Sequence, residues 1–165
     1  MRYRNIRNQN LLIIALFLFG LSSVIYIIPK FEIDPLLNRE KLLIEEAVLS
    51  HLFKNNASGG SGIAAYYFIR DSPDILNKFK DHIPIVESES NSKLTDDFNS
   101  VVLHRDNGKD GIIFTVHDMD RKLNGQVYVI ATYYVASLNG GSYEYLLEKI
   151  NGEWVVLSSN MKWIS

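Results

Sequence analysis

A histidine beside a carboxylate is the residue pattern in this chain most suited to acid–base chemistry, because imidazole titrates near neutral pH and a carboxylate can orient it. The four histidines are His51, His82, His104 and His117. His117 lies in the densest polar cluster, His-Asp-x-Asp-Arg at residues 117–121. Successive strand residues point to opposite faces, so His117 and Asp118 are not expected to pair with each other. We name both as candidate pocket or partner-binding residues, with a solvated strand end as the simpler interpretation.

Other common reaction centres are missing from the sequence. The chain has no cysteine, which excludes a disulfide framework, a cysteine-ligated zinc site and a thiol nucleophile. Residues 106–111 hold Asp and Gly without the spacing of an EF-hand loop, and Gly59-Gly60-x-Gly62 lacks the Lys of a phosphate-binding loop. No GxSxG or HExxH motif occurs. We therefore predict no catalytic residue, no metal ligand and no cofactor.

Tyrosine is abundant after residue 30, and it offers large contact area at low entropic cost. The seven tyrosines in this part are Tyr66, Tyr67, Tyr128, Tyr133, Tyr134, Tyr143 and Tyr145. The adjacent pairs Tyr66-Tyr67 and Tyr133-Tyr134 are candidate partner-binding or pocket residues. Tyrosine also stabilises strands by packing alone, which is the simpler interpretation of the same residues.

A long apolar segment precedes the rest of the chain. Residues 11–28, LLIIALFLFGLSSVIYII, carry no charge. As a helix they would be about 27 Å long, close to the roughly 30 Å hydrocarbon core of a bilayer. Arg2, Arg4 and Arg7 precede them without any acid, which predicts a basic cytoplasmic tail over residues 1–10. We predict a single-pass anchor in the inner (plasma) membrane, with a signal peptide cleaved after Ser22 as the alternative.

Both interpretations export residues 29–165, which we predict to form one periplasmic or extracellular domain. The whole chain of 165 residues is nearly neutral, with 17 Lys and Arg against 19 Asp and Glu. Four of the cations lie in residues 1–30, so residues 31–165 hold 13 cations and all 19 acids, a net charge of −6. An acidic domain has no electrostatic footprint for nucleic acid.

The first part of this domain contains helix signals. Asp34-Pro35 predicts a helix start, and an apolar stripe continues to the polar residues 54–56 before a Gly/Ser loop at 58–62. The charged residues assigned to the wet face of this helix are Arg39, Glu40, Lys41, Glu45 and Glu46. Residues 63–70 fit a strand or a second helix, and Ser72-Pro73 opens a short helix to about residue 81. Residues 83–86 suggest a short strand and the polar residues 87–99 a mobile loop.

From residue 101 the chain alternates apolar segments with Asn-Gly pairs, which favour hairpin turns because both residues tolerate positive φ. The pairs are Asn107-Gly108, Asn124-Gly125, Asn139-Gly140 and Asn151-Gly152. The expected strands of this antiparallel meander cover residues 101–105, 111–117, 126–137, 143–150 and 153–157. Ile112, Phe114 and Val116 should face the core. Residues 127–135 are apolar on both faces and predict a central strand covered on both sides.

One or two helices on a curved antiparallel sheet make an α+β fold. The closing segment, with Tyr143-x-Tyr145 followed by Asn151-Gly152-x-Trp154-x-Val156, resembles the final hairpin of the cone-shaped nuclear-transport-factor-2-like folds. The resemblance covers about the last 65 residues. The same stretch is also similar to the C-terminal parts of small exported bacterial proteins without assigned function. The related ketosteroid-isomerase group implies an Asp base and a Tyr donor inside an apolar cone. No residue here matches that pair one-to-one, so the resemblance implies a fold alone.

Three functions follow from these patterns, the third being an oligomerising scaffold that associates through its sheet face. The first is a membrane-anchored, extracytoplasmic protein-interaction module without catalytic activity, of an immunity or envelope-assembly type, whose protein partner lies at the membrane surface. The second is a small-ligand-binding or enzymatic domain that uses the interior of the cone, which requires an enclosed pocket with converging polar groups.

Overall fold

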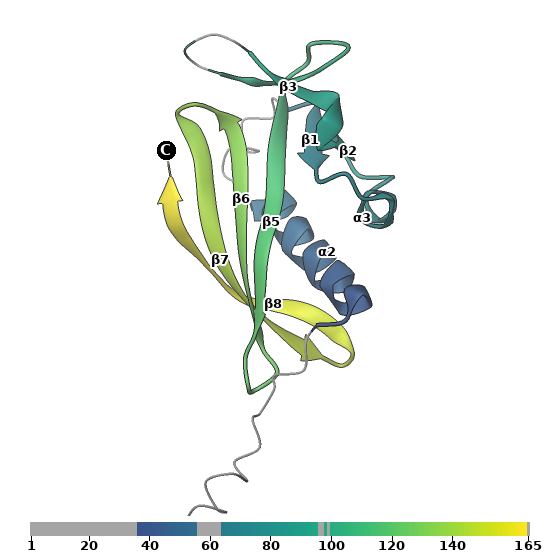
Figure 1. The fold of residues 1–165 in the computed structure, drawn as a ribbon, viewed down its shortest axis with the longest axis vertical. Coiled ribbons are helices and arrows are strands. Elements are labelled where there is room, and N and C mark those ends of the chain that lie inside the picture. Colours follow the sequence, from purple (N-terminus) through teal and green to yellow (C-terminus); the bar gives the residue numbers. More distant parts are fainter. Residues whose placement is uncertain (1–35, 56–63, 96–97, 99, 165) are drawn as a thin grey trace, which may run out of the picture. The chain divides into compact units, whose positions relative to one another are not determined.

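The computed structural model describes residues 36–55, 64–95, 98 and 100–164 (Figure 1). All of these lie in the second of two compact units, Ile33–Ser165. The elements are α2 (Asn38–Asn55), β1 (Tyr66–Ile69), α3 (Pro73–Lys78), β2 (Ile85–Ser88), the 3-10 helix η2 (Glu89–Asn91), β3 (Ser92–Leu94), β4 (Val102–His104), β5 (Gly111–Arg121), β6 (Val127–Ala136), β7 (Asn139–Ile150) and β8 (Glu153–Ile164). The expected anchor at residues 11–28 lies outside the described residues. Within the described part, none of the helices is long and apolar enough to span a bilayer.

The fold is α+β, as expected, but its main sheet is mixed rather than purely antiparallel. Six strands follow the order β2-β1-β5-β6-β7-β8, and β3 pairs with β4 in a separate two-stranded sheet. β1 runs parallel to β2 and to β5, whereas β5 to β8 pair antiparallel. The parallel β1–β2 pair is possible because α3 supplies the crossover between them. The expected meander is therefore correct for β5 to β8 only.

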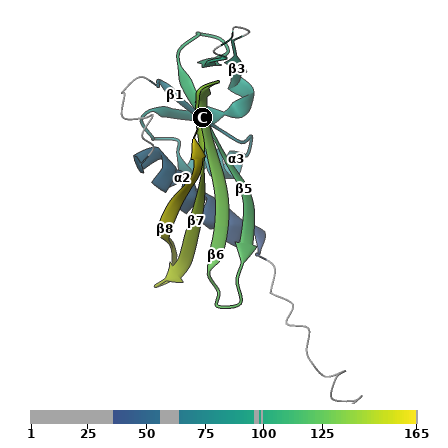
Figure 2. The ribbon, with the colours of Figure 1, turned by 90° about the vertical axis from the view of Figure 1, so that its left-hand side faces the viewer.

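Helix α2 lies across one face of the curved sheet and forms the core with it (Figures 1 and 2). Its buried stripe includes Ile44, Val48, Leu49 and Leu52, at spacings that place them on one side of a helix. The expected end near residue 55 is confirmed. The expected start at Asp34-Pro35 lies outside the described residues; α2 begins at Asn38, and Leu36 and Leu37 before it are not helical.

The short helix α3 begins as its sequence predicts. Ser72 occupies the N-cap with extended backbone angles and Pro73 the first helical position. The helix ends at Lys78, earlier than residue 81. Of the two possibilities for residues 63–70, the strand is confirmed, because β1 covers Tyr66–Ile69.

The expected mobile loop at residues 87–99 is wrong for its described residues up to 94. They form the end of β2, then η2 and β3. Local hydrogen bonds order this polar stretch: the Ser92 hydroxyl donates to the Glu89 carbonyl at 2.8 Å, and Ser88 Oγ accepts from the Ser90 N–H at 3.2 Å. His104 of β4 also binds this stretch. Its Nδ1 accepts a hydrogen bond from the Asp106 N–H, so its Nε2 carries the proton and donates to the Glu87 carboxylate, 3.1 Å away. Order that depends on side-chain hydrogen bonds in a polar stretch produces no hydrophobic periodicity, so the sequence pattern did not reveal it.

Three of the four Asn-Gly turns form. Asn151 and Gly152 both have positive φ, 53° and 89°, as a type I′ turn requires. Gly108 and Gly125 also have positive φ. Asn139-Gly140 is instead the start of β7, and the β6–β7 turn consists of residues 137 and 138. The next residue shows why small side chains are needed there: a Cβ on Gly141 would lie 2.7 Å from the Tyr133 ring.

The strands extend beyond their predicted ends, and one predicted face is wrong. β5 continues to Arg121 through a bulge between Val116 and Met119, and β8 continues to Ile164. On β5, Ile112 and Phe114 are buried and Val116 packs on the core, which confirms the predicted inward face. On the central strand β6, Tyr128 and Ile130 are 37% and 39% exposed. The predicted covering of β6 on both sides is therefore wrong, because α2 covers one face only.

Candidate functional site

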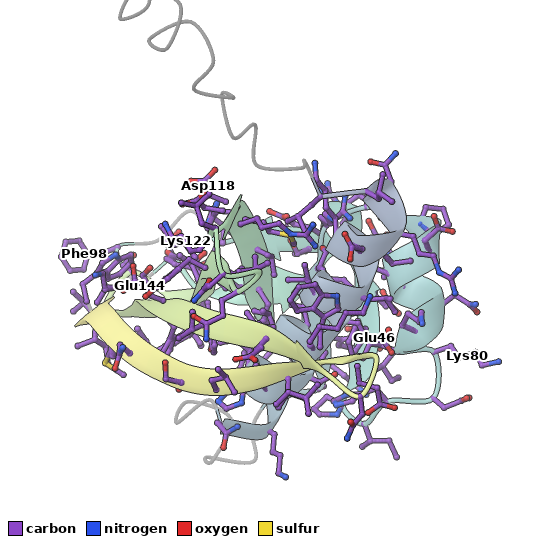
Figure 3. All side chains as sticks on the ribbon, turned by 90° about the horizontal axis from the view of Figure 1, so that it is seen from below. Glu46, Lys80, Phe98, Asp118, Lys122 and Glu144 are labelled. Atoms are coloured by element: carbon purple, nitrogen blue, oxygen red, sulfur yellow. The ribbon has the colours of Figure 1, made fainter. Side chains whose placement is uncertain are left out.

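The bulge in β5 positions the His117-Asp118 pair. Both residues fall in the irregular stretch between Val116 and Met119. The His117 ring is hydrogen bonded through Nε2 to the Thr132 hydroxyl, 2.9 Å away on β6. Asp118 is exposed and points away from the sheet (Figure 3). The hydrogen-bond partner of His117 Nε2 is thus Thr132 of β6 and not Asp118.

His117 and Asp118 line an open hollow of about 270 Å³ between β5 and α2. Lys41 and Glu45 of α2 and Arg70 after β1 complete its polar lining. A second open hollow, of about 630 Å³, shares Lys41 and Arg70 and adds Asn38, Ser72 and Asp74. Both hollows are shallow and charged, which differs from the enclosed apolar pocket typical of small-molecule sites.

The Glu45–Arg70 ion pair is the functional-site feature that the sequence does not reveal. The predicted wet face of α2 includes Glu45, yet Glu45 is only 3% exposed. Arg70 meets it with two parallel hydrogen bonds, from Nε to Oε1 at 2.6 Å and from a terminal nitrogen to Oε2 at 2.5 Å. The hydrogen bond to Glu45 raises the pKa of Arg70 despite partial burial, and the carboxylate charge adds to the shift. Both carboxylate oxygens are occupied, so Glu45 is not a free general base.

The four candidate tyrosines do not form one surface. Tyr67 and Tyr133 are buried in the core beneath α2. Tyr66 lies on the opposite side of β1, where its ring contacts His104 at 4.4 Å and its hydroxyl accepts from the Asn107 amide at 2.9 Å. Tyr134 donates to the Ser100 carbonyl at 3.1 Å. These contacts match the sheet-packing interpretation of the tyrosines.

Three inward-facing tyrosines form a row that ends at α2. The ring centroids of Tyr133 and Tyr143 lie 6.2 Å apart, those of Tyr143 and Tyr145 6.0 Å apart, and His51 meets Tyr145 edge-on at 5.5 Å. Burial raises the pKa of Tyr145, and the neighbouring Tyr143 adds to that shift. Burial also raises the pKa of Tyr133.

The raised pKa values predict alkaline unfolding. The folded protein holds these phenolic protons more tightly than the unfolded chain, so their stabilisation is complete below pH 10 and is lost as the pH rises through the folded values. We expect the free energy of unfolding to fall above pH 10 with a slope of at most about 1.4 kcal/mol per pH unit for each buried tyrosine. Urea titrations from pH 8 to 11.5 measure the slope, and Tyr145→Phe should make it shallower. An equal slope in both proteins would contradict the assignment.

Across the sheet from α2, the outer faces of β6, β7 and β8 carry an exposed apolar patch. The residues of this outer patch are the exposed Tyr128, Ile130, Val155 and Trp163, together with the half-buried Leu146. Tyr128 lies directly opposite Leu146 in the β6–β7 register, and charged residues surround them. Figure 3 shows two of these, Lys122 and Glu144, close together on this side. The sequence signal for the patch is the two-sided apolar run at residues 127–135, which we assigned to a covered strand.

No described residues form a group of three or more His, Cys, Asp or Glu side chains that converge as metal ligands do. The sequence resemblance to nuclear-transport-factor-2-like folds stays a prediction. No family model, curated protein or solved structure matches the chain.

Proposed function

We propose that this chain is a membrane-tethered interaction module that binds a protein partner through its outer patch and catalyses no reaction. The outer patch, with Tyr128, Ile130, Val155 and Trp163 exposed and Leu146 half-buried, is the observation that carries the proposal. Exposed apolar surface beside charged residues is typical of protein-binding sites, because burying it contributes about 25 cal/mol for each Å² removed from water. Tyrosine and tryptophan are also the residue types enriched where binding energy concentrates.

The filled inner face of the sheet favours this proposal over a ligand-binding or enzymatic domain. Side chains of α2 occupy the space that an interior pocket would need: Ile44, Val48 and Leu52 are each at most 1% exposed. The polar hollow beside α2 is open, and its buried carboxylate is already bound by Arg70. Catalysis by a carboxylate requires a free oxygen within reach of substrate.

The tether is the part of the proposal that rests on residues 1–30. The uncharged segment 11–28 behind Arg2, Arg4 and Arg7 supports a membrane anchor with the folded domain outside the cytoplasm. A tether confines the domain near partners in the same membrane and raises its effective concentration there. A reporter active only outside the cytoplasm, fused after Ser165, should be active. Activity of a cytoplasm-specific reporter at the same position would overturn this topology.

Photo-crosslinking in the membrane tests the partner site. A photoreactive amino acid at Ile130, in the outer patch, should trap one discrete protein, because the side chain is exposed within the apolar surface. Lys80 is the matched control, since it is also exposed and lies on the opposite side of the domain from Glu144 (Figure 3). Adding Tyr128→Asp should abolish the adduct at Ile130 without unfolding the domain. Equal labelling at Ile130 and Lys80, or an adduct that survives Tyr128→Asp, would contradict the proposal.

A further inference from the structure

Strand β8 leaves one long edge of the main sheet open. It has 12 residues, from Glu153 to Ile164, and pairs only with β7. Beyond β8 no further strand lies in the part of the chain that the structure describes. The other edge strand, β2, has 4 residues. An edge strand presents unpaired backbone N–H and C=O groups, which accept another strand if its side chains allow it.

Strand β8 has few of the charged side chains that normally prevent an edge strand from pairing with another strand. The strand carries two charged residues, Glu153 and Lys162. Lys162 is engaged within its own chain by Glu144, at 3.2 Å. Large apolar side chains remain accessible beside it, with Met161 49% and Trp163 52% exposed. Two bulges interrupt β8, at residues 157 and 162, and the stretch between them pairs regularly with β7.

The order of residues along β8 makes the strand self-complementary. Apolar residues lie at both ends: Trp154 to Val156 at one end, and Met161, Trp163 and Ile164 around Lys162 at the other. The polar residues Ser158, Ser159 and Asn160 lie between them. Reversing a second copy against the first therefore brings apolar side chains opposite apolar ones. A strand of uniform polarity would not select a copy of itself in this way.

The register with β7 tells which face each side chain occupies. Val156, Ser159 and Met161 lie opposite the inward-facing Leu147, Tyr145 and Tyr143. Val155, Asn160 and Trp163 lie opposite the outward-facing Glu148, Glu144 and Ser142. When two antiparallel edge strands are related by a twofold axis perpendicular to the sheet, one residue lies opposite the same residue of the second copy. Side chains on the inner face then meet inner side chains, and those on the outer face meet outer side chains.

We propose that β8 pairs antiparallel with β8 of a second copy of this chain, about a twofold axis at Ser159. With the bulge residues 157 and 162 left out of the count, this register places Val156 opposite Met161 of the second copy on the inner face. On the outer face it places Val155 opposite Trp163 of the second copy. A register centred on Ser158, counted in the same way, instead places Val156 opposite Ser159 and Val155 opposite Asn160, which loses both apolar contacts. The Ser159 register also joins the two outer patches into one surface, because Val155 and Trp163 both belong to them.

Cysteine crosslinking tests the register directly, because the chain has no native cysteine. Opposite residues in an antiparallel pair have Cα atoms about 4.5–5.5 Å apart, within reach of a disulfide. Full-length Ser159→Cys, oxidised in its membrane or in detergent, should form a covalent dimer. Val155→Cys alone should not crosslink. Val155 of one copy lies opposite Trp163 of the other, so the two copies of Val155 are separated by the ladder positions between Val155 and Trp163, roughly 20 Å at about 3.3 Å per position. A mixture of Val155→Cys and Trp163→Cys chains should again crosslink. Stronger crosslinking of Val155→Cys than of Ser159→Cys would overturn the proposed register.

A charge at the interface tests the second copy as the occupant. Met161→Lys should raise the dimer dissociation constant at least about tenfold in sedimentation equilibrium, since it places a cation opposite Val156 of the second copy. Leu123→Lys, an exposed apolar residue in the β5–β6 turn, is the matched control and should leave the constant unchanged. A monomer at all concentrations, or a Ser159→Cys crosslink to a different protein only, would overturn the proposal. Crosslinking from Ile130 tests the protein partner at the outer patch, whereas the cysteine and sedimentation experiments test the β8 dimer, so failure of one proposal can be distinguished from failure of the other.

Discussion

Arg70→Met should lower the free energy of unfolding by about 3 kcal/mol, near the lower end of the values for breaking a buried ion pair. The variant leaves the Glu45 carboxylate, which is 3% exposed, without the two hydrogen bonds that it accepts from Arg70. The loss is at the lower end because the Arg70 side chain is itself half exposed, which screens the pair. Chemical denaturation followed by the fluorescence of Trp154 and Trp163 measures the change.

Two further variants separate the geometry of the pair from its charge. Arg70→Lys keeps the cation but not the planar fork, so we expect an intermediate loss. The double variant Glu45→Met with Arg70→Met should be more stable than Arg70→Met alone, because no buried charge remains unpaired. A loss under about 0.5 kcal/mol in Arg70→Met would show that water enters and solvates Glu45, the range typical of exposed pairs.

Gly111→Ala should destabilise the protein by about 3 kcal/mol through overpacking. Gly111 begins β5 and lies opposite Tyr66 of the parallel strand β1. A Cβ at this position would lie 2.3 Å from Cε2 of Phe68, 2.9 Å from its Cδ2 and 3.3 Å from the Tyr66 carbonyl oxygen. Phe68 is fully buried, so its ring has no free space into which it can turn. Thermal and urea unfolding of the variant measure the loss.

A double-mutant cycle identifies the cause as steric. Phe68→Leu removes the ring atoms that Gly111→Ala would strike, and it lowers stability on its own by leaving a cavity. The double variant should therefore be more stable than the sum of the two single losses predicts, by about 1–2 kcal/mol of coupling. Additive losses would mean that the contact with Phe68 is not what restricts this position to glycine.

Local signals in the sequence predicted the features whose causes are local. Ser72-Pro73 marks the start of α3 because proline fixes its own backbone angle at the first helical position. Asn151-Gly152 marks a type I′ turn because the two residues themselves adopt positive φ. The apolar stripe of α2 and the inward face of β5 follow from periodicity alone.

Three of the errors concern residues whose state depends on other elements of the fold. Glu45 is buried because Arg70, 25 residues later, reaches it with a guanidinium group. Asn139-Gly140 belongs to a strand because the neighbouring Gly141 faces the Tyr133 ring on β6. β1 is parallel to its neighbours because α3 carries the chain across the sheet. None of these partners is adjacent in the sequence, so no local pattern contains them.

The sequence by itself determined the acidic charge of residues 31–165, the absence of cysteine chemistry, the α+β class and an apolar segment at residues 11–28. It also determined where α3 and three of the Asn-Gly turns form. Only the tertiary structure decided that α2 covers a single face of β6, which leaves Tyr128 and Ile130 exposed. The physical reason is that periodicity shows whether a face is apolar, whereas burial depends on whether another element packs against it, and α2 can cover only one side of the sheet.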